Sequence, residues 1–304
     1  MKTLDIIIPV YNEEACINQT MERLLGLRDK FRGKLNLSYI FINDGSSDKS
    51  EEILEEYAKK DKSIKIISFS RNFGHQAAIS AGLDYSKADY NAIIDADLQD
   101  PPELIYDMYE KSLEGYDIVY GKRLKRKSET AFKKLSAWGF YRILKSMCNI
   151  EIPTDTGDFR FITKDVREAF NKMKEKHRFI RAMIPWTGFK SAPVCFDRPE
   201  RIAGETKYPL SKMLKLAFDG IFSFSFKPID FIFILSALLF LAALVILGFG
   251  AFDEMEEEYI ICFTLTLTCS VNLLAMGILG QYIARIYDEA KDRPIYIVKK
   301  SINF

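Results

Sequence analysis

The sequence predicts an α/β protein with a mostly parallel sheet and helices on both of its faces, followed by a hairpin of two membrane-spanning helices. In the first 120 residues, short apolar runs alternate with segments whose apolar residues recur at helical spacing. Such alternation is typical of a parallel sheet covered on both faces. In the last third, residues 231–252 and 259–284 carry no charge, and each segment is long enough to cross about 30 Å of hydrocarbon.

The predicted elements follow one another along the chain in alternation. We expect strands over residues 4–10, 37–43, 64–69, 90–94 and 117–120, and helices over residues 13–25, 47–59, 75–85 and 102–113. The strands are short apolar runs, whereas the helices place their apolar residues on one face. Pro102 favours a helix start, because the N–H that proline lacks is unpaired in a first helical turn.

Composition argues against several classes of function. The chain of 304 residues has a formal net charge of +1, which gives no reason to expect a nucleic-acid partner. Its five cysteines form no C-x-x-C pair and no cluster with histidine, which disfavours a zinc site and a disulfide framework. We therefore expect the soluble part to face a reducing cytosol. The apolar run at residues 6–8 is too short for a secretory signal.

Charges around the two apolar segments predict their orientation. Lysines precede the first segment, the acidic link at residues 253–258 separates the two, and arginines and lysines follow the second. The positive-inside rule then places both termini in the cytoplasm. We expect a multi-pass protein of the cell membrane, with a cytosolic domain at residues 1–228, a transmembrane hairpin at 229–285 and a cytosolic tail at 286–304.

Polar residues gather where four of the predicted strands end. They lie at residues 11–13, 43–48, 70–72 and 95–97. In open α/β sheets, ligands bind where the carboxyl ends of the strands open into loops. The four polar clusters therefore predict one binding site at that edge of the sheet.

The last of these clusters has the chemistry of a metal site. Residues i and i+2 of an extended chain point to the same side, so Asp95, Asp97 and Gln99 are able to converge. Oxygen ligands at this spacing suit Mg²⁺ or Mn²⁺, with room for water and phosphate. The alternative is that the paired aspartates only cap the next helix.

Two segments have the composition of helices that lie in a membrane interface. Residues 122–127 are strongly basic, and residues 132–145 interleave aromatic and aliphatic side chains with lysine and arginine. Residues 208–224 carry apolar residues on one side and lead into the first apolar segment. Such helices place their cations toward lipid phosphates. An ordinary amphipathic surface helix is the alternative for the first of them.

Three motifs together resemble a known family. Residues 9–14 (PVYNEE), 43–48 (NDGSSD) and 95–103 (DADLQDPPE) resemble family 2 glycosyltransferases of the Rossmann-like GT-A fold. More narrowly, the chain resembles polyprenyl-phosphate glycosyltransferases, which include bactoprenol glucosyltransferases and dolichol-phosphate mannose synthases. The resemblance covers nearly the whole chain, including the two apolar segments and residues 293–298.

The resemblance implies a nucleotide-sugar donor and a divalent metal. It assigns the nucleotide to residues of the strand-end loops, with Asp44 suited to a base edge and Glu13 to a ribose hydroxyl. The metal ligands on the diphosphate would be Asp95, Asp97 and Gln99. The full nucleotide-binding set is Pro9, Tyr11, Glu13, Asp44, Arg71 and Asp95. Asn12 and Asp48 have a simpler interpretation as helix caps.

The resemblance also implies a catalytic base at Asp158, within residues 155–160 (DTGDFR). A lipid monophosphate has a second pKa near 6, so it is largely dianionic at cytosolic pH and scarcely needs a proton removed. Three alternatives remain: Asp158 orients the sugar, steadies Arg160, or caps a turn beside Gly157. For His75, a capping or packing role is favoured over contact with substrate.

An anionic acceptor requires cations. The resemblance assigns the lipid phosphate to Arg123, which is also expected to be catalytic, and to Arg201 and Lys207 in a second acceptor loop. Arginine offers a bidentate fork to phosphate oxygens and lysine a point charge. These residues complete the predicted acceptor side of the site.

Taken with the membrane segments, the resemblance implies an inverting transfer of one sugar from a nucleotide donor, with UDP-glucose as the first expectation, to polyprenyl (undecaprenyl) phosphate at the cytoplasmic face. The alternatives are a GDP-mannose transferase, a processive polysaccharide synthase, and an inactive membrane scaffold that only binds sugar nucleotides. Neither tryptophan, Trp138 or Trp186, stands in the Gln-x-x-Arg-Trp motif of processive synthases. By family analogy alone we expect a homo-oligomer, a tetramer in the bactoprenol branch.

Overall fold

The computed structural model describes residues 1–124, 156–197, 227–250 and 257–304. The strands are β1 (Lys2–Val10), β2 (Leu35–Asn43), β3 (Ile64–Phe69), β4 (Tyr90–Ile93), β5 (Ile118–Arg123), β6 (Thr156–Thr163), β7 (Ser191–Phe196) and β8 (Val298–Ile302). The helices are α1 (Glu14–Phe31), α2 (Ser50–Lys60), α3 (His75–Tyr85), α4 (Leu104–Leu113), α6 (Lys164–Asn171), α7 (Ile180–Trp186), α9 (Lys227–Gly250) and α10 (Glu257–Ala290).

The described strands form one sheet in the order β7-β5-β6-β4-β1-β2-β3-β8. Strands β1 to β4 run parallel to one another, and β5 runs parallel to β7. Strand β6 runs antiparallel to both β4 and β5, and β8 runs antiparallel to β3. The predicted α/β class with a mostly parallel sheet is confirmed.

Helices cover both faces of this sheet, as predicted. Consecutive residues of a strand point to opposite faces, so Ile6 and Ile8 enter one buried cluster and Ile7 enters the other. The first cluster packs under α1, α2 and α4, and the second under α3, α6 and α7. Strands buried on both faces explain why the predicted ones read as continuous apolar runs.

Several element bounds match the predictions and others differ. Strand β3 and helix α3 have the predicted limits, but α4 begins at Leu104 because residues 101–103 form a turn in which Leu104 N donates to the Pro101 carbonyl. The sequence patterns did not predict β6, α6, α7, β7 and β8. Strand β8 carries exposed residues at the sheet edge, so it lacks the apolar run that revealed the central strands.

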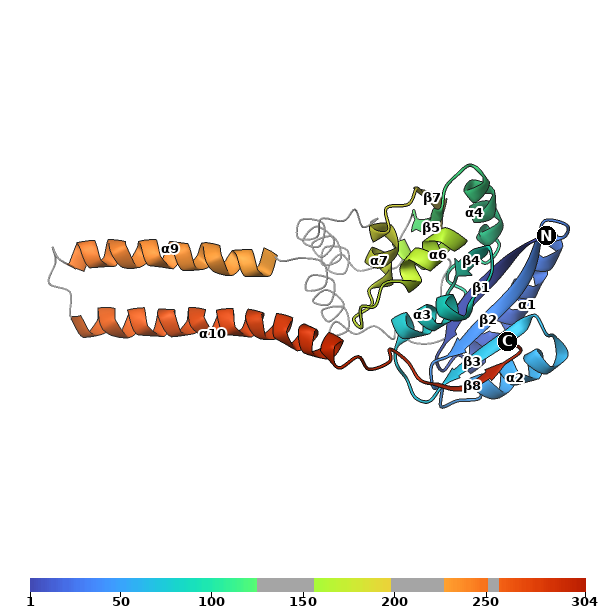
Figure 1. Cartoon of the computed structure of the whole chain (residues 1–304), viewed down its shortest axis with the longest axis horizontal. Helices are drawn as coiled ribbons and strands as arrows, with labels where there is room; N and C mark the ends of the chain where they lie inside the picture. Colours follow the sequence, from blue (N-terminus) through green and yellow to red (C-terminus); the bar gives the residue numbers. More distant parts are fainter. Residues whose placement is uncertain (125–155, 198–226, 251–256) are drawn as a thin grey trace.

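Helices α9 and α10 run beside each other and project away from the sheet (Figure 1). Among the described residues, one helix, Phe263–Ala290, is long and apolar enough to cross a membrane, and the apolar window within it is not buried against protein. The predicted span at 259–284 falls mostly within that helix. The span at 231–252 remains a prediction, although α9 covers most of it. The predicted interfacial helices lie outside the described residues.

The end of α10 is fastened to the loop between α6 and α7. Lys176 N donates to Glu289 Oε1 at 2.7 Å, Lys176 Nζ lies 2.7 Å from Asp292 Oδ1, and His177 Nε2 lies 3.3 Å from Asp288 Oδ2. The chain then returns to the sheet, where β8 pairs with β3. The segment predicted as a separate tail, 286–304, therefore contributes an edge strand to the α/β domain.

Candidate active site

The predicted site lies at a point where the sheet order reverses. The chain builds β1, β2 and β3 in one direction and then places β4 on the other side of β1. The loops after β1 and β4 diverge at such a switch point, which leaves a crevice for ligands. Tyr11 and Glu13 follow β1, and Asp95 follows β4, so these predicted residues flank the switch point.

The loops after β1 and β2 are tied together by hydrogen bonds. Asn12 N donates to Ser46 Oγ at 3.0 Å, and Ser47 N donates to Asn12 Oδ1 at 2.8 Å. Glu13 N donates to Ser50 Oγ at 2.9 Å. Tyr11 remains 41% exposed on this scaffold. The bonds hold the predicted nucleotide loop in place before any ligand arrives.

Asp48 has the capping role that was considered for it. Its Oδ1 accepts from Ser50 N at 3.0 Å at the start of α2, and its Oδ2 accepts from Glu14 N at 3.1 Å at the start of α1. Because these N–H groups have no partner within their own helices, one carboxylate serves both helix starts.

Asp44 joins the loops after β2 and β3. Its Oδ1 accepts from Phe73 N at 2.7 Å and its Oδ2 accepts from Gly74 N at 3.0 Å. The side chain is buried, with the residue 3% exposed, and this burial raises the pKa of the carboxyl despite the two hydrogen bonds. The sequence suggested only a base-binding role. The structure adds that Asp44 shapes the loop that carries Arg71 and leads into His75.

We expect Asp44→Asn to loosen this loop. An asparagine amide would face one of the two backbone N–H donors with its own NH₂ group, leaving a buried donor unpaired, at a cost of about 1–3 kcal/mol. Thermal unfolding and titration with UDP should both register the change. Asp107→Asn makes the same chemical change on the exposed surface of α4 and serves as the control. Equal behaviour of the two variants would show that Asp44 does not support the loop.

Arg71 lies exposed after β3, with its guanidinium carbon 4.2 Å from the centroid of the Phe73 ring. The guanidinium also donates to the Asn72 carbonyl through Nη1 at 3.3 Å. Cation–π contact of this kind orients an arginine without neutralising it. Arg71 thus lies at the carboxyl ends of the parallel strands, as Asp44 does.

The segment after β4 is held in an irregular conformation. Ile94 N donates to the Ile7 carbonyl at 3.1 Å, and Thr20 Oγ1 donates to the Ala96 carbonyl at 2.8 Å. Leu98 is buried and has a φ of +57°, a left-handed conformation that costs a residue with a side chain roughly 1–2 kcal/mol. Gln99 N donates to Asp97 Oδ1 at 3.1 Å. The fold therefore fixes the loop that carries Asp95, Asp97 and Gln99.

The capping interpretation of Asp95 and Asp97 is wrong. Helix α4 begins at Leu104, after Glu103, and no side-chain hydrogen bond caps it in the described structure. Asp97 instead accepts from the backbone of Gln99 within its own loop.

The residues of this loop fit a divalent cation. Asp95 Oδ1 is buried and accepts no hydrogen bond within the described structure, with His75 Nε2 3.4 Å away, and burial raises the pKa of the carboxyl. A cation at Asp95 would relieve that cost. No group of three or more His, Cys, Asp and Glu side chains suited to a metal occurs in the described part of the chain. Mg²⁺ commonly binds through one or two carboxylates plus substrate phosphates, so Asp95 and Asp97 suffice together with a diphosphate.

Asp158 on β6 is enclosed by cations. Arg181 of α7 binds both of its oxygens, Nε to Oδ1 at 3.0 Å and Nη2 to Oδ2 at 2.8 Å. His75 Nε2 lies 3.4 Å from Asp158 Oδ2 and 3.4 Å from Asp95 Oδ1. Burial raises the pKa of Asp158, but the Arg181 charge and the bonds from Arg181 and His75 outweigh it and hold the pKa well below its usual range.

His75 therefore connects the two halves of the predicted site. Burial lowers its pKa, but the carboxylates of Asp95 and Asp158 outweigh this and raise it above the ordinary value. No side-chain hydrogen bond caps α3 in the described structure, so the capping part of the expectation is wrong, and the imidazole lies between two carboxylates of the predicted site. One feature of the sequence could have identified His75 as a site residue: it directly follows the polar loop after the third strand. Arg181 gave no signal, since nothing in the sequence places residue 181 beside residue 158.

Arg160 does not bind the Asp158 carboxylate in any hydrogen bond described here. It is buried, and it donates to the Ile180 carbonyl through Nη1 at 3.3 Å and to the Gly157 carbonyl through Nη2 at 3.2 Å. Burial lowers the pKa of its guanidinium to about 10. Arg160 thus ties β6 to the start of α7. No described hydrogen bond joins it to Asp158, although the Asp158 charge raises the pKa of the guanidinium against the effect of burial.

Arg123 lies at the end of β5 beside Gly157. Its Nη2 is 3.3 Å from Asp100 Oδ1, and a Cβ added at Gly157 would lie 2.6 Å from the same nitrogen. The absence of a side chain at Gly157 is therefore what admits the guanidinium. The other predicted acceptor cations, Arg201 and Lys207, lie outside the described residues.

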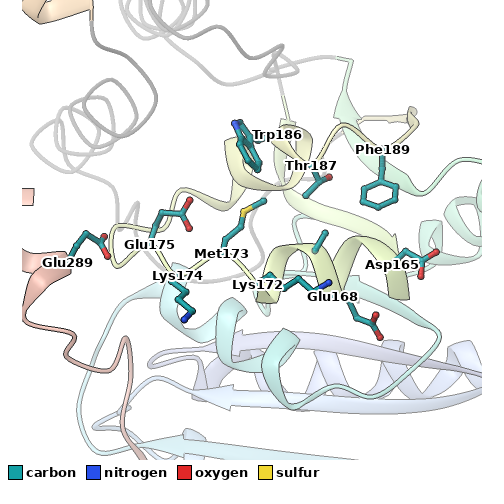
Figure 2. Close-up of a pocket in the computed structure, with 11 residues that line it drawn as sticks. Asp165, Glu168, Lys172, Met173, Lys174, Glu175, Trp186, Thr187, Phe189 and Glu289 are labelled. Carbon is teal, nitrogen blue, oxygen red and sulfur yellow. The ribbon is translucent and has the colours of Figure 1, made fainter. Parts of the chain in front are cut away.

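The cavity drawn in Figure 2 has a volume of about 930 Å³ and lies between α6, the following loop, α7 and the end of α10. It contains none of the predicted site residues. Trp186 borders it and is 60% exposed. The labelled charged side chains do not converge on one point in Figure 2. The strand-end crevice remains the candidate site.

Known proteins share this sequence over nearly its whole length. The model of the family described as Glycosyl transferase family 2 matches residues 5–170. The uncharacterized glycosyltransferase YkcC of Bacillus subtilis (strain 168) is 50% identical over 302 residues, which cover 97% of this chain and 93% of that protein. The prophage bactoprenol glucosyl transferase homolog of Escherichia coli (strain K12) is 34% identical over 306 residues, which cover 98% of each chain.

Similarity to solved structures is more distant. Glucosyl-3-phosphoglycerate synthase from Mycobacterium tuberculosis, in complex with uridine diphosphate, aligns with a TM-score of 0.48 and 18% identity, over 73% of this chain and 78% of that one. The sequence relatives match 97–98% of this chain, compared with 73% for this solved structure.

Proposed function

Because this chain belongs to glycosyltransferase family 2, we propose that it transfers one sugar from a nucleotide-sugar, with UDP-glucose as the first expectation, to polyprenyl phosphate. The observation that carries the proposal is the convergence of the loops after β1 to β4 at the sheet's switch point, with Asp95 and Asp97 among them. Support for the lipid acceptor comes from the 34% identity, over 98% of the chain, to a bactoprenol glucosyl transferase homolog.

The donor half of the reaction is assigned to the strand-end loops. The loop of Tyr11 and Glu13, together with Asp44 and Arg71, would hold the nucleotide. Asp95 and Asp97, with Gln99, would hold Mg²⁺ or Mn²⁺. That metal would stabilise the negative charge that develops on the departing nucleoside diphosphate.

The acceptor half is assigned to Arg123 and, outside the described residues, to Arg201 and Lys207. The lipid phosphate oxygen attacks the anomeric carbon in line, its lone pair forms the new C–O bond, and the electrons of the old bond leave with the diphosphate. Configuration inverts, and no proton has to move. The low pKa of Asp158 fits this scheme, because a carboxyl that is already ionised and paired with Arg181 is a weak proton acceptor.

A membrane location would bring the enzyme to its lipid. We propose that α9 and α10 form the transmembrane hairpin at residues 229–285 and that both termini and the α/β domain are cytoplasmic. The C-terminal end of α10 leads back to the sheet domain through β8, which supports a hairpin whose second helix ends on the side of that domain. Assembly into a tetramer is proposed from the family resemblance alone.

A donor screen tests the function. The full chain in detergent or lipid is incubated with undecaprenyl phosphate, Mn²⁺ or Mg²⁺, and labelled UDP-glucose, UDP-GlcNAc or GDP-mannose, and labelled lipid is extracted. We expect metal-dependent transfer with UDP-glucose, and chelation with EDTA should abolish it. Transfer from GDP-mannose alone would replace UDP-glucose with the mannose alternative. Nucleotide binding without transfer from any donor would contradict the enzyme assignment and favour the inactive scaffold.

A further inference from the structure

The Asp158 carboxylate is buried and bound through both of its oxygens. Both of its oxygens are bound by the Arg181 fork at 3.0 and 2.8 Å, and the residue is 2% exposed. Bidentate arginine–carboxylate pairs fix the plane of the carboxylate as well as its charge. The groups that face Asp158 are His75 from α3, Arg181 from α7 and Arg160 from β6, with Asp95 beyond His75.

The backbone of Ile180, directly before Arg181 on α7, is held by two hydrogen bonds. Ile180 N donates to Gln76 Oε1 at 2.9 Å, and the Ile180 carbonyl accepts from Arg160 Nη1 at 3.3 Å. Gln76 is the neighbour of His75 on α3. The residue before Arg181 is therefore held from two sides, by α3 and by β6, which fixes the backbone from which the Arg181 side chain extends.

A fixed carboxylate has a clear use in glycosyl transfer. As the bond between the anomeric carbon and the diphosphate breaks, the sugar gains positive charge, as in the oxocarbenium-like transition state of glycoside hydrolysis. An oriented negative charge in a site with little water stabilises such a charge without having to reorganise during the reaction.

We propose that Arg181 is a positioning residue that holds Asp158 as an oriented carboxylate facing the donor sugar, so that Asp158 stabilises positive charge on the sugar and takes no proton from the acceptor. The inference rests on the proposed function. Arg181 acts through Asp158 and touches neither substrate. His75 supports the same carboxylate from the side of Asp95.

A double-mutant cycle tests this assignment. Arg181→Gln should lower kcat about 10- to 100-fold, the range typical when the partner that orients a functional ligand is lost, while donor KM and UDP affinity stay near wild type. Arg181→Lys keeps the charge without the fork, so it should recover part of the loss. In the Asp158→Asn background, Arg181→Gln should change kcat by no more than about twofold, because the group through which it acts is already gone.

The variants also separate positioning from folding. Arg181→Gln leaves a buried carboxylate without its main partner and lowers stability, whereas Arg181→Gln with Asp158→Asn removes both charges. If the single variant does not fold, the double variant is compared with Asp158→Asn: equal kcat supports the proposal, and a further loss overturns it. Arg28→Gln is the matched control, because it removes a 2.5 Å pair with Asp61 at the opposite edge of the sheet.

The same assay distinguishes a failure of the proposed Arg181 role from a failure of the proposed function. With an active wild-type enzyme, losses that multiply in the double variant, or a fall in UDP affinity as large as the fall in kcat, would overturn the role of Arg181 alone. A wild-type enzyme that binds UDP but transfers no sugar from any donor would overturn the proposed function, and this inference with it.

Discussion

Replacing Asp97 with alanine is expected to abolish metal-dependent sugar transfer, with a loss in kcat/KM of about 1,000-fold or more, the upper range for removing one group that stabilises transition-state charge. Asp97 lies in the loop after β4, where its carboxylate accepts from Gln99 N at 3.1 Å. Asp95 in the same loop has a buried oxygen that accepts no described hydrogen bond and lies 3.4 Å from His75 Nε2. In the Asp97→Ala variant, Asp95 would be the one remaining loop carboxylate that holds the cation together with the diphosphate.

The measurement has two parts. Labelled sugar transfer is recorded against Mn²⁺ concentration, and bound Mn²⁺ is counted by electron paramagnetic resonance with UDP present. Asp97→Ala should lose both signals, whereas Asp107→Ala on the exposed face of α4 should lose neither. Full activity of Asp97→Ala at low Mn²⁺ would remove Asp97 from the metal site.

The second large effect is expected at Gly45, where two strand-end loops touch. An added Cβ would lie 2.5 Å from the Arg71 carbonyl carbon and 2.7 Å from Asn72 N, and both are backbone atoms that have no rotamer to escape into. The residue also has a φ of +67°, which favours glycine. Gly45→Ala should therefore cost about 3 kcal/mol in unfolding free energy, since conformational strain and overpacking add. UDP binding should be lost as the loops separate.

Gly33 offers a matched control for this experiment. It has a φ of +77°, and an added Cβ would meet no atom within 4 Å. Gly33→Ala should thus pay only the conformational strain, about 1 kcal/mol, and bind UDP normally. Chemical denaturation gives both free energies, and calorimetry gives the affinities. Equal losses of unfolding free energy in the two variants would mean that the close contact of residue 45 with the Arg71 and Asn72 backbone adds no strain of its own.

Sequence patterns predicted the first half of the fold well because its signals are local. The run at Ile6, Ile7 and Ile8 is buried on both faces of the sheet, so it reads as a strand without any knowledge of its neighbours. The polar residues that follow each such run then had to lie at one edge. Asp95 and Asp97 were found in this way, and the family resemblance gave their chemistry.

The second half resisted prediction for the opposite reason. Strand β6 contains Asp158 and Arg160, whose burial depends on partners supplied by α3 and α7. Charged residues in a strand do not read as an apolar run, so residues 155–160 were recognised only as a motif. Strand β8 was missed because it lies at the sheet edge with exposed lysines at its centre, so it has no apolar run.

By itself, the sequence determined the α/β class, the edge of the sheet at which the polar loops gather, the carboxylates suited to a metal, and the length and charge pattern of two apolar segments. Only the tertiary structure decided that His75 lies between Asp95 and Asp158 and that Arg181 grips Asp158. The physical reason is the separation along the chain of the residues that interact. Periodicity and strand-end position depend on residues a few places apart, whereas the ionic state of Asp158 depends on cations from α3 and α7 that only the folded chain brings within 3.4 Å.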